Sequence, residues 1–411
     1  MIIYTSILSN YLGKSLALAE SVLQHHPNVD FRIYLLDYKS AETPTSEWLR
    51  EHLNIRNECQ LPRFYDSLSC VPPEHFLCER FNIVEACTAV KPFIMHSLLE
   101  ESHLTIYLDP DIILYAPLDV NSQCQWDIQL IPHILQPAKV QGSTPLSERL
   151  FANFGIYNLG YLAVRPTEAG KNLINWWIRS CDLFGIANPS AGLYVDQKFF
   201  DFAPSFVENL SILRDPGCNV AWWNIFCDGR HLCGNGYEIS YNNKIYPLRF
   251  FHFSNLDSTE SNNPYIAKPL KNLDCNNKDI FLLNSCPLME NLFNNYNSRV
   301  NEFNQLLPEQ ILLTKRLRAE RSVAERIKRR INDELYRIHA IETSCLVANK
   351  PSVHKYRRPR HLALPKSLAQ AISSLIIKLL KTGLLKKHSL RVWSQCINNL
   401  ISPSLFYYTN F

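Results

Sequence analysis

The opening of the chain constrains the fold more than any other feature. Residues 2–8 form an apolar run, residues 11–25 repeat apolar side chains at helical spacing, and residues 31–36 form a second apolar run. This order predicts a strand, a helix and a second strand, and such a crossover joins parallel strands of one sheet. We therefore expect an α/β fold with a mixed, mainly parallel sheet flanked by helices.

Two carboxylates follow a later apolar run. Residues 104–108 predict a buried strand, Asp109 and Asp111 come directly after it, and residues 112–115 carry the chain away. Side chains at i and i+2 of an extended segment point the same way, and open α/β sheets hold ligands at the carboxyl ends of strands. Oxygen ligands suit Mg²⁺ or Mn²⁺, which commonly hold phosphates. The alternative is a polar turn with Pro110 at its corner.

Two polar motifs lie further along the chain. Gly155, Asn158 and Gly160 surround the start of an apolar run, which indicates either close backbone approach to a ligand or a tight turn. Asp196 and Gln197 stand side by side, a pair that can bind sugar hydroxyls, although Asp is also an ordinary helix cap.

Aromatic residues and a histidine supply the last two motifs. Trp222 and Trp223 are flanked by Asn219 and Asn224, which suits a carbohydrate surface or, alternatively, a core aromatic pair. His252 lies in an apolar strand pattern and is either a buried core histidine or a nitrogen ligand for the metal held by the two aspartates.

Taken in order, these motifs resemble the GT-A type nucleotide-sugar glycosyltransferases. The resemblance covers about residues 1–257 and is strongest to the glycogenin-like and bacterial lipopolysaccharide-galactosyltransferase-like branch. It rests on the order of four motifs: D-x-D at residues 109–111, N-L-G at 158–160, D-Q at 196–197 and H-F-S at 252–254. It implies a GT-A (nucleotide-diphospho-sugar transferase) fold and a hexosyltransferase that needs Mn²⁺ or Mg²⁺.

The resemblance also implies roles for single residues. Asp109, Asp111 and His252 would hold the metal, with both aspartates reaching the nucleotide. Asn158, Asp196 and Gln197 would border the donor sugar as the catalytic set. The other implied donor-binding residues are Thr5 and Ser6 beside the base, Lys91 at the diphosphate or sugar, and Gly160 and Ser254 within their motifs. Lys91 has the alternative of a solvated helix lysine, and Lys268 stands further from His252 than the family's lysine does.

The implied reaction moves a sugar from a nucleotide-sugar donor, a UDP-sugar, to a glycan or lipid-linked acceptor in cell-envelope polysaccharide synthesis. In the resembled branch the anomeric configuration is retained, so no strong base is needed. An inverting enzyme would need one, and Asp196 is then the candidate. Trp222 and Trp223 are the candidate acceptor surface.

Charge divides the chain unevenly. Residues 301–411 hold 20 Lys and Arg against 7 Asp and Glu, while residues 1–300 hold 22 against 31. We expect a catalytic domain at 1–270, a helical extension with a long basic helix at 271–350, and a basic linker with amphipathic helices at 351–411. The amphipathic segment 366–387 predicts either binding to an anionic membrane surface or packing on protein.

Composition sets the remaining expectations. The 13 cysteines include no C-x-x-C pair, no leader-like segment opens the chain, and no long uncharged apolar run occurs, so we expect a cytoplasmic protein, peripheral at the inner membrane face. The sequence lacks the interleaved basic and aromatic residues that would indicate nucleic acid binding. Two other functions stay open. A sugar nucleotidyltransferase would need a glycine-rich basic loop that residues 5–13 lack, and a non-catalytic scaffold would keep the fold and work through its tail.

Overall fold

The computed structural model describes residues 1–38, 43–72, 75, 81, 83–120, 125–137, 148–188, 192–225, 228–254 and 287–307. The chain divides into two compact units, Met1–Ala319 and Glu320–Phe411, and every described residue belongs to the first. The predicted basic helix at 309–341, the linker, the amphipathic segment 366–387 and Lys268 lie outside the described residues. Their predictions stay untested.

A seven-stranded sheet forms the centre of the first unit, in the order β10-β6-β7-β4-β1-β2-β3. Strand β7 is antiparallel to both of its neighbours, and the other pairs are parallel. The predicted mixed, mainly parallel sheet is confirmed, including the parallel pairing of the first two strands. The strands are β1 (Ile2–Ile7), β2 (Asp30–Leu35), β3 (Arg63–Asp66), β4 (Thr105–Leu108), β6 (Ile128–Pro132), β7 (Tyr157–Val164) and β10 (Leu210–Ile212).

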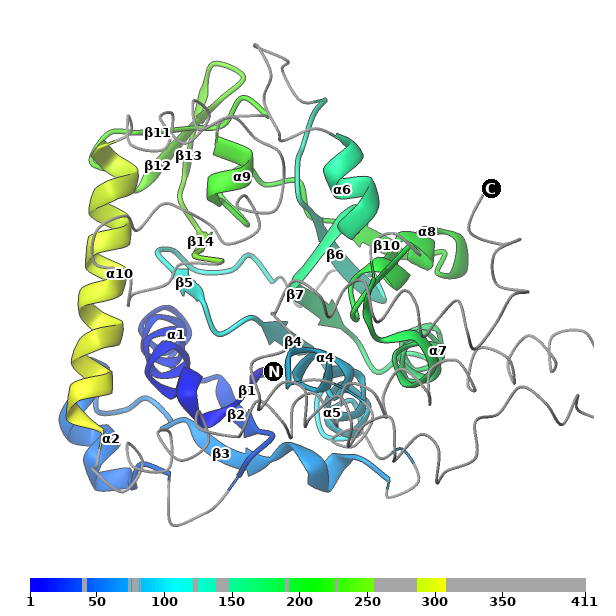
Figure 1. Cartoon of the computed structure of the whole chain (residues 1–411). Helices are drawn as coiled ribbons and strands as arrows, with labels where there is room; N and C mark the ends of the chain where they lie inside the picture. The colour runs from blue at the N-terminus through cyan, green and yellow to red at the C-terminus, as the bar shows by residue number, and fades with distance from the viewer. Residues whose placement is uncertain are drawn as a thin grey trace, which may run out of the picture. The chain divides into compact units, whose positions relative to one another are not determined.

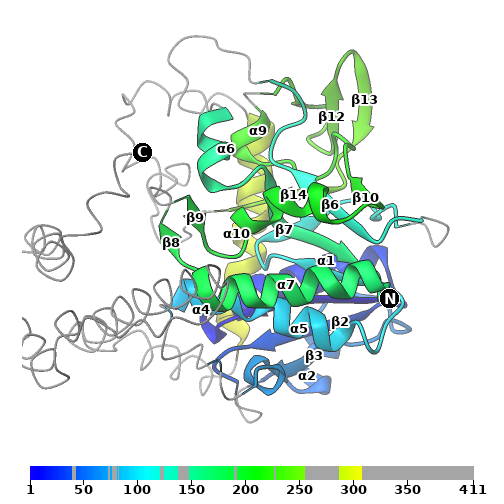
Figure 2. The same cartoon turned by 90° about the vertical axis from the view of Figure 1, so that its right-hand side faces the viewer.

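Helices cover both faces of this sheet, each over its own hydrophobic core (Figures 1 and 2). On one face packs α1 (Leu12–His25), with α10 (Pro287–Leu306) against α1, and on the other face pack α4 (Ile83–Ala89), α5 (Lys91–Leu98) and α7 (Glu168–Phe184). Shorter helices are α2 (Ser46–His52), α6 (Glu148–Phe154), α8 (Ala203–Phe206) and α9 (Trp222–Ile225). Pro92 lies in the first turn of α5, where a missing backbone N–H leaves no helical hydrogen bond unmade.

Small sheets lie beside the main one. Strand β5 (Ile112–Leu114) pairs antiparallel with β14 (Phe250–His252), and this pair holds the functional site. The others are β8 (Ala187–Asn188) with β9 (Leu193–Tyr194), and β11 (His231–Cys233) with β12 (Glu238–Tyr241) and β13 (Lys244–Pro247). Strand β3 pairs parallel with β2 and ends the main sheet on that side.

Helix α10 belongs to the core of the first unit, although it follows the predicted domain boundary at residue 270. The Tyr296 ring stacks on Phe253 at 4.2 Å between centroids, and Phe293 meets Phe253 edge-on at 5.5 Å. The Arg299 guanidinium pairs with Glu20 of α1. The helix therefore buttresses the segment that directly follows His252.

None of the helices in the described part of the chain has both the length and the apolar character needed to cross a membrane.

Candidate active site

The two aspartates lie where β4 gives way to β5. The Asp109 N–H donates to the Gly160 carbonyl at 2.9 Å, and the Ile112 N–H donates to the Asp109 carbonyl at 3.1 Å, which closes the turn between them. In the pairing of β14 with β5, His252 stands opposite Ile112, and the Phe253 N–H donates to the Asp111 carbonyl at 2.8 Å. Backbone register thus brings a histidine from far along the chain to the acidic pair.

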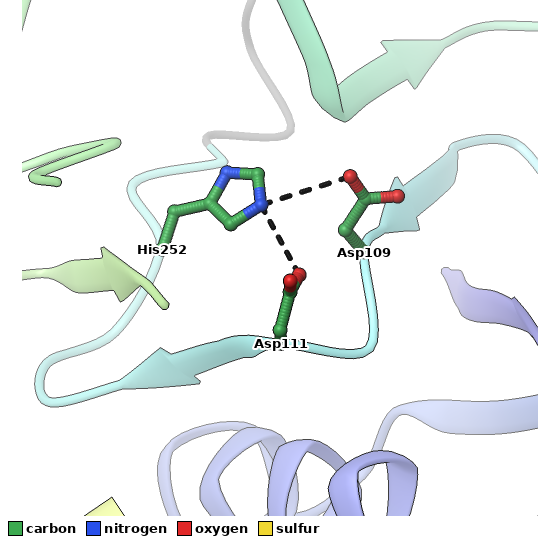
Figure 3. A group of neighbouring side chains, drawn as sticks. All are labelled: Asp109, Asp111 and His252. Atoms are coloured by element: carbon green, nitrogen blue, oxygen red, sulfur yellow. Dashed lines mark ion pairs between the residues drawn. The ribbon is translucent and has the colours of Figure 1, made fainter. Parts of the chain in front are cut away.

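Three side chains converge at this point (Figure 3). His252 Nε2 lies 3.1 Å from Asp111 Oδ1 and 3.7 Å from Asp109 Oδ2. One ligand atom from each of the three lies within 4.8 Å of the others. Burial acts to raise the pKa of Asp111, but the neighbouring His252 outweighs it and the pKa is lowered, which favours the carboxylate. Two carboxylates and one imidazole are a donor set that can hold a divalent metal ion.

The position of His252 depends on the residues around its ring. The Asn158 Nδ2 lies 3.3 Å from His252 Nδ1, and the Trp223 ring meets the imidazole edge-on at 5.3 Å. A Cβ on Gly160 would lie 2.6 Å from His252 Cε1 and 2.8 Å from Asn158 Oδ1, so only glycine leaves room for the imidazole. The N-L-G motif therefore acts as a seat for the histidine.

A buried lysine joins two of the carboxylates. Lys91 Nζ lies 3.2 Å from Asp109 Oδ1 and 3.1 Å from Asp196 Oδ2, and Lys91 is only 5% exposed. Burial acts to lower the pKa of Lys91, but the two aspartates outweigh it and the pKa is raised. The Tyr107 hydroxyl donates to Asp109 Oδ1 at 2.6 Å. Lys91 is therefore a charged member of the site and not a solvated surface lysine.

Asp196 is the most deeply buried of the acidic groups at this site. It is 3% exposed, and burial raises its pKa above the usual value despite the ammonium of Lys91. The Asp196 carbonyl accepts from the Trp177 indole N–H at 3.0 Å, which fixes the backbone beneath the side chain.

A cavity of about 780 Å³ extends from the three converging side chains. Among the residues predicted from the sequence, it is lined by Ser6, Lys91, Asp109, Asp111, Asn158, Asp196, Gln197, Trp222, Trp223, His252 and Ser254. Thr5 and Gly160 do not line it. The Thr5 hydroxyl is fully buried and has no hydrogen-bond partner among the described residues, and Gly160 acts through the space it leaves.

Two of the predicted sugar contacts already have backbone partners. Gln197 Oε1 accepts from the Leu159 N–H at 3.1 Å, and its Nε2 donates to the Phe154 carbonyl at 3.0 Å. Asn158 Oδ1 accepts from the Gly160 N–H at 2.7 Å. Both amides thus hold the start of β7 in place, and their roles toward the donor sugar stay predictions.

The tryptophans differ in exposure. Trp223 is 6% exposed and packs between His252 and His133, whereas Trp222 is half-buried and donates from its indole N–H to the Ser254 carbonyl at 3.2 Å. Trp223 is therefore largely a core side chain, as one of the two alternatives predicted. Trp222 presents surface to the cavity, and its role as a carbohydrate surface stays a prediction.

Sequence reasoning missed an aromatic wall of the cavity. Tyr11, Phe151, Phe154 and Tyr194 line it, and Tyr11 is 40% exposed. Tyr11 follows β1 by a single turn, so its closeness to Ser6 in the sequence could have predicted its place at the cavity. Phe151 and Phe154 lie one turn apart on α6, and Tyr194 ends β9; no spacing in the sequence connects that helix with Tyr194.

Comparisons with known proteins found one curated relative and a set of solved structures. No family model matches the chain. The uncharacterized protein YfnF of Bacillus subtilis (strain 168) is 26% identical over 182 residues, which cover 41% of this chain and 56% of that protein, so the match spans little more than half of this curated relative's length.

Solved structures similar to this chain include glycosyltransferases. The galactosyltransferase LgtC, in complex with donor and acceptor sugar analogues, is 16% identical with a TM-score of 0.38, over 66% of this chain and 94% of LgtC. Mouse xyloside xylosyltransferase 1 is 13% identical with a TM-score of 0.38, over 61% of this chain and 96% of its own. At such identities and TM-scores these similarities carry no argument about this chain, and the proposal below rests on the geometry of the site.

Proposed function

We propose that this protein is a metal-dependent glycosyltransferase that moves a sugar from a nucleotide-sugar donor to a glycan acceptor. The observation that carries the proposal is the convergence of Asp109, Asp111 and His252, with ligand atoms within 4.8 Å of one another, on a cavity of about 780 Å³. Two anions side by side favour a cation, and a divalent cation in turn favours a diphosphate.

The chain's own groups divide the work in this scheme. A divalent cation held by the three ligands would stabilise the charge that develops on the leaving diphosphate. Lys91 pairs with Asp109 and Asp196 and offsets their negative charge beside the donor. Asp196 lines the cavity and lies within reach of a sugar bound there. In a retaining reaction the acceptor attacks from the leaving-group side, and Asp196 then binds the donor sugar without acting as a base.

The finer parts of the proposal concern the substrates and the setting. We propose a UDP-sugar as donor, retention of configuration, and a glycan or lipid-linked acceptor of cell-envelope polysaccharide synthesis at the cytoplasmic membrane face. Residues 301–411 hold 20 basic and 7 acidic residues, which supports the setting at the membrane face. Each basic residue near an anionic leaflet contributes about 1 kcal/mol to membrane binding.

A nucleotide-sugar panel tests the proposal. Thermal unfolding of the full chain is measured with each nucleotide sugar in the presence and absence of Mn²⁺, and donor hydrolysis is followed in parallel. A ligand at 100 times its Kd stabilises the chain by about 2.7 kcal/mol, and we expect this only with Mn²⁺ or Mg²⁺ present.

Asp111→Asn should abolish the metal-dependent stabilisation and the hydrolysis. Glu58→Gln, a change at a carboxylate whose side chain is 63% exposed, should leave both unchanged. Turnover by Asp111→Asn with unaltered metal dependence would refute the proposal. Stabilisation by none of the nucleotide sugars would favour the scaffold alternative.

A further inference from the structure

A second cavity lies at the opposite end of β6 from the active site. It measures about 680 Å³ and is lined by residues of α7, by Phe206 and Val207 at the end of α8, and by Asp127 just before β6. Asp127 directly precedes β6 and His133 directly follows it, and His133 packs against the Trp223 that lines the active site. At about 3.3 Å per residue, this separation is about 20 Å, so the two cavities are distinct.

The floor of this second cavity holds a largely buried carboxylate. Asp127 is only 9% exposed. Its N–H donates to the Asn209 carbonyl at 2.8 Å, and its carbonyl accepts from the Arg165 N–H at 2.9 Å, so its backbone is fixed. Its side chain lines the cavity, where a ligand carrying hydrogen-bond donors can bind the carboxylate.

The walls combine aromatic rings with small polar groups. The Trp176 and Phe206 rings meet edge-on at 5.0 Å, and Phe206 is 54% exposed. Thr167, Glu168 and Asn172 supply a hydroxyl, a carboxylate and an amide at the rim. No Lys, Arg or His is among the described residues that line the cavity.

We infer that this cavity is an accessory carbohydrate site that binds pyranose rings of a neutral glycan. The C–H face of a sugar stacks on an aromatic ring, while its hydroxyls donate to carboxylates and exchange hydrogen bonds with amides. The lack of cations among the described lining residues disfavours phosphates and nucleic acids. The cavity volume of about 680 Å³ lies in the range of small-molecule ligand sites, roughly 300–1,000 Å³.

Such a site adds a function to the catalytic one. A glycan held in this cavity stays near the enzyme between turnovers, which raises the effective concentration of its free end without any new contact at the active site. Binding at this cavity needs neither metal nor nucleotide sugar. The accessory site can therefore fail while the proposed transferase activity stands, and the reverse also holds.

Titration calorimetry of the full chain with neutral malto-, cello-, galacto- and chito-oligosaccharides, without metal or nucleotide, tests the inference. We expect at least one series to bind. Trp176→Ala and Asp127→Asn should each weaken binding by about tenfold, which corresponds to about 1.4 kcal/mol. Asn172→Ala changes an exposed position on α7 and should also weaken binding, so it serves if a buried variant fails to fold.

Phe202→Ala is the matched control. Phe202 is 58% exposed and stacks on Phe206 at 6.1 Å but does not line the cavity, so its loss should leave affinity unchanged. Asp111→Asn, at the active site, should bind the same oligosaccharide as the wild type. Two results would each overturn the inference: no oligosaccharide binds, or the cavity variants bind as the wild type does.

Discussion

Replacing Gly160 by alanine adds one methyl group at the seat of the metal-site histidine. The added Cβ would stand 2.6 Å from His252 Cε1 and 3.0 Å from His252 Nδ1. Gly160 lies within β7 and is not among the described residues with positive φ, so an alanine backbone fits there without strain. The perturbation is therefore a collision of side chains and not a change of backbone conformation.

The size of the effect follows from these distances. Carbon atoms in contact sit about 3.5–4.0 Å apart, so the imidazole must retreat by about 1 Å. Metal–ligand distances tolerate only about 0.2 Å of error, and changes to groups that orient a ligand typically cost 10- to 100-fold in metal affinity. Overpacking of this kind also costs about 1–3 kcal/mol of stability. We expect Mn²⁺ affinity to fall at least tenfold in Gly160→Ala.

Mn²⁺ binding is measured by electron paramagnetic resonance titration of the free ion, with urea unfolding on the same samples. Gly192→Ala is the control, because its added Cβ meets nothing within 4 Å although the backbone φ of +72° strains any side chain. That variant should lose stability and keep its Mn²⁺ affinity. If Gly160→Ala bound Mn²⁺ within threefold of the wild type, His252 would not be a metal ligand held in place by its glycine seat.

Three further changes probe stability by urea unfolding. Lys91→Met should destabilise the fold by about 3–5 kcal/mol, because two carboxylates lose their buried partner; an unchanged midpoint would contradict the ion-pair network. Phe293→Ala should cost about 3–5 kcal/mol if α10 is part of the core, and a loss below about 1 kcal/mol would show that it is not. Burial lowers the pKa of His133 to about 4 from 6.5. Between these pH values His133 is protonated in the unfolded chain and neutral in the folded chain. Stability should fall by up to about 3 kcal/mol between pH 6.5 and 4, and His133→Gln should flatten that slope, whereas equal slopes would speak against a neutral buried imidazole.

Local pattern was enough for the elements that open the chain and for the acidic pair. The alternation of apolar runs with helical spacing predicted β1, α1 and β2 and the parallel pairing of the two strands. Periodicity encodes which face of an element is buried, and that information lies within a few neighbouring residues. The position of Asp109 and Asp111 followed from the end of the apolar strand alone, which the sequence pattern locates.

Other features had no local signal. The short strand β3 carries polar and aromatic side chains and forms by pairing with β2, and the antiparallel direction of β7 is a choice between pairings of similar local sequence. Strand pairing depends on context more than on propensity. The same holds for α10, which looks like an ordinary amphipathic helix until Phe253 and Phe251 receive its aromatic side chains.

The sequence by itself determined the kind of sheet, the place of Asp109 and Asp111 at its edge and, through the order of the motifs, the candidate chemistry. Only the tertiary structure decided which groups meet there. It seated His252 against Gly160, placed Lys91 between two aspartates, assigned the amides of Asn158 and Gln197 to the backbone, and set Asp127 at the floor of a separate cavity. The physical reason is that side-chain spacing along a strand is fixed by covalent geometry, whereas contacts between distant segments are fixed by packing and register.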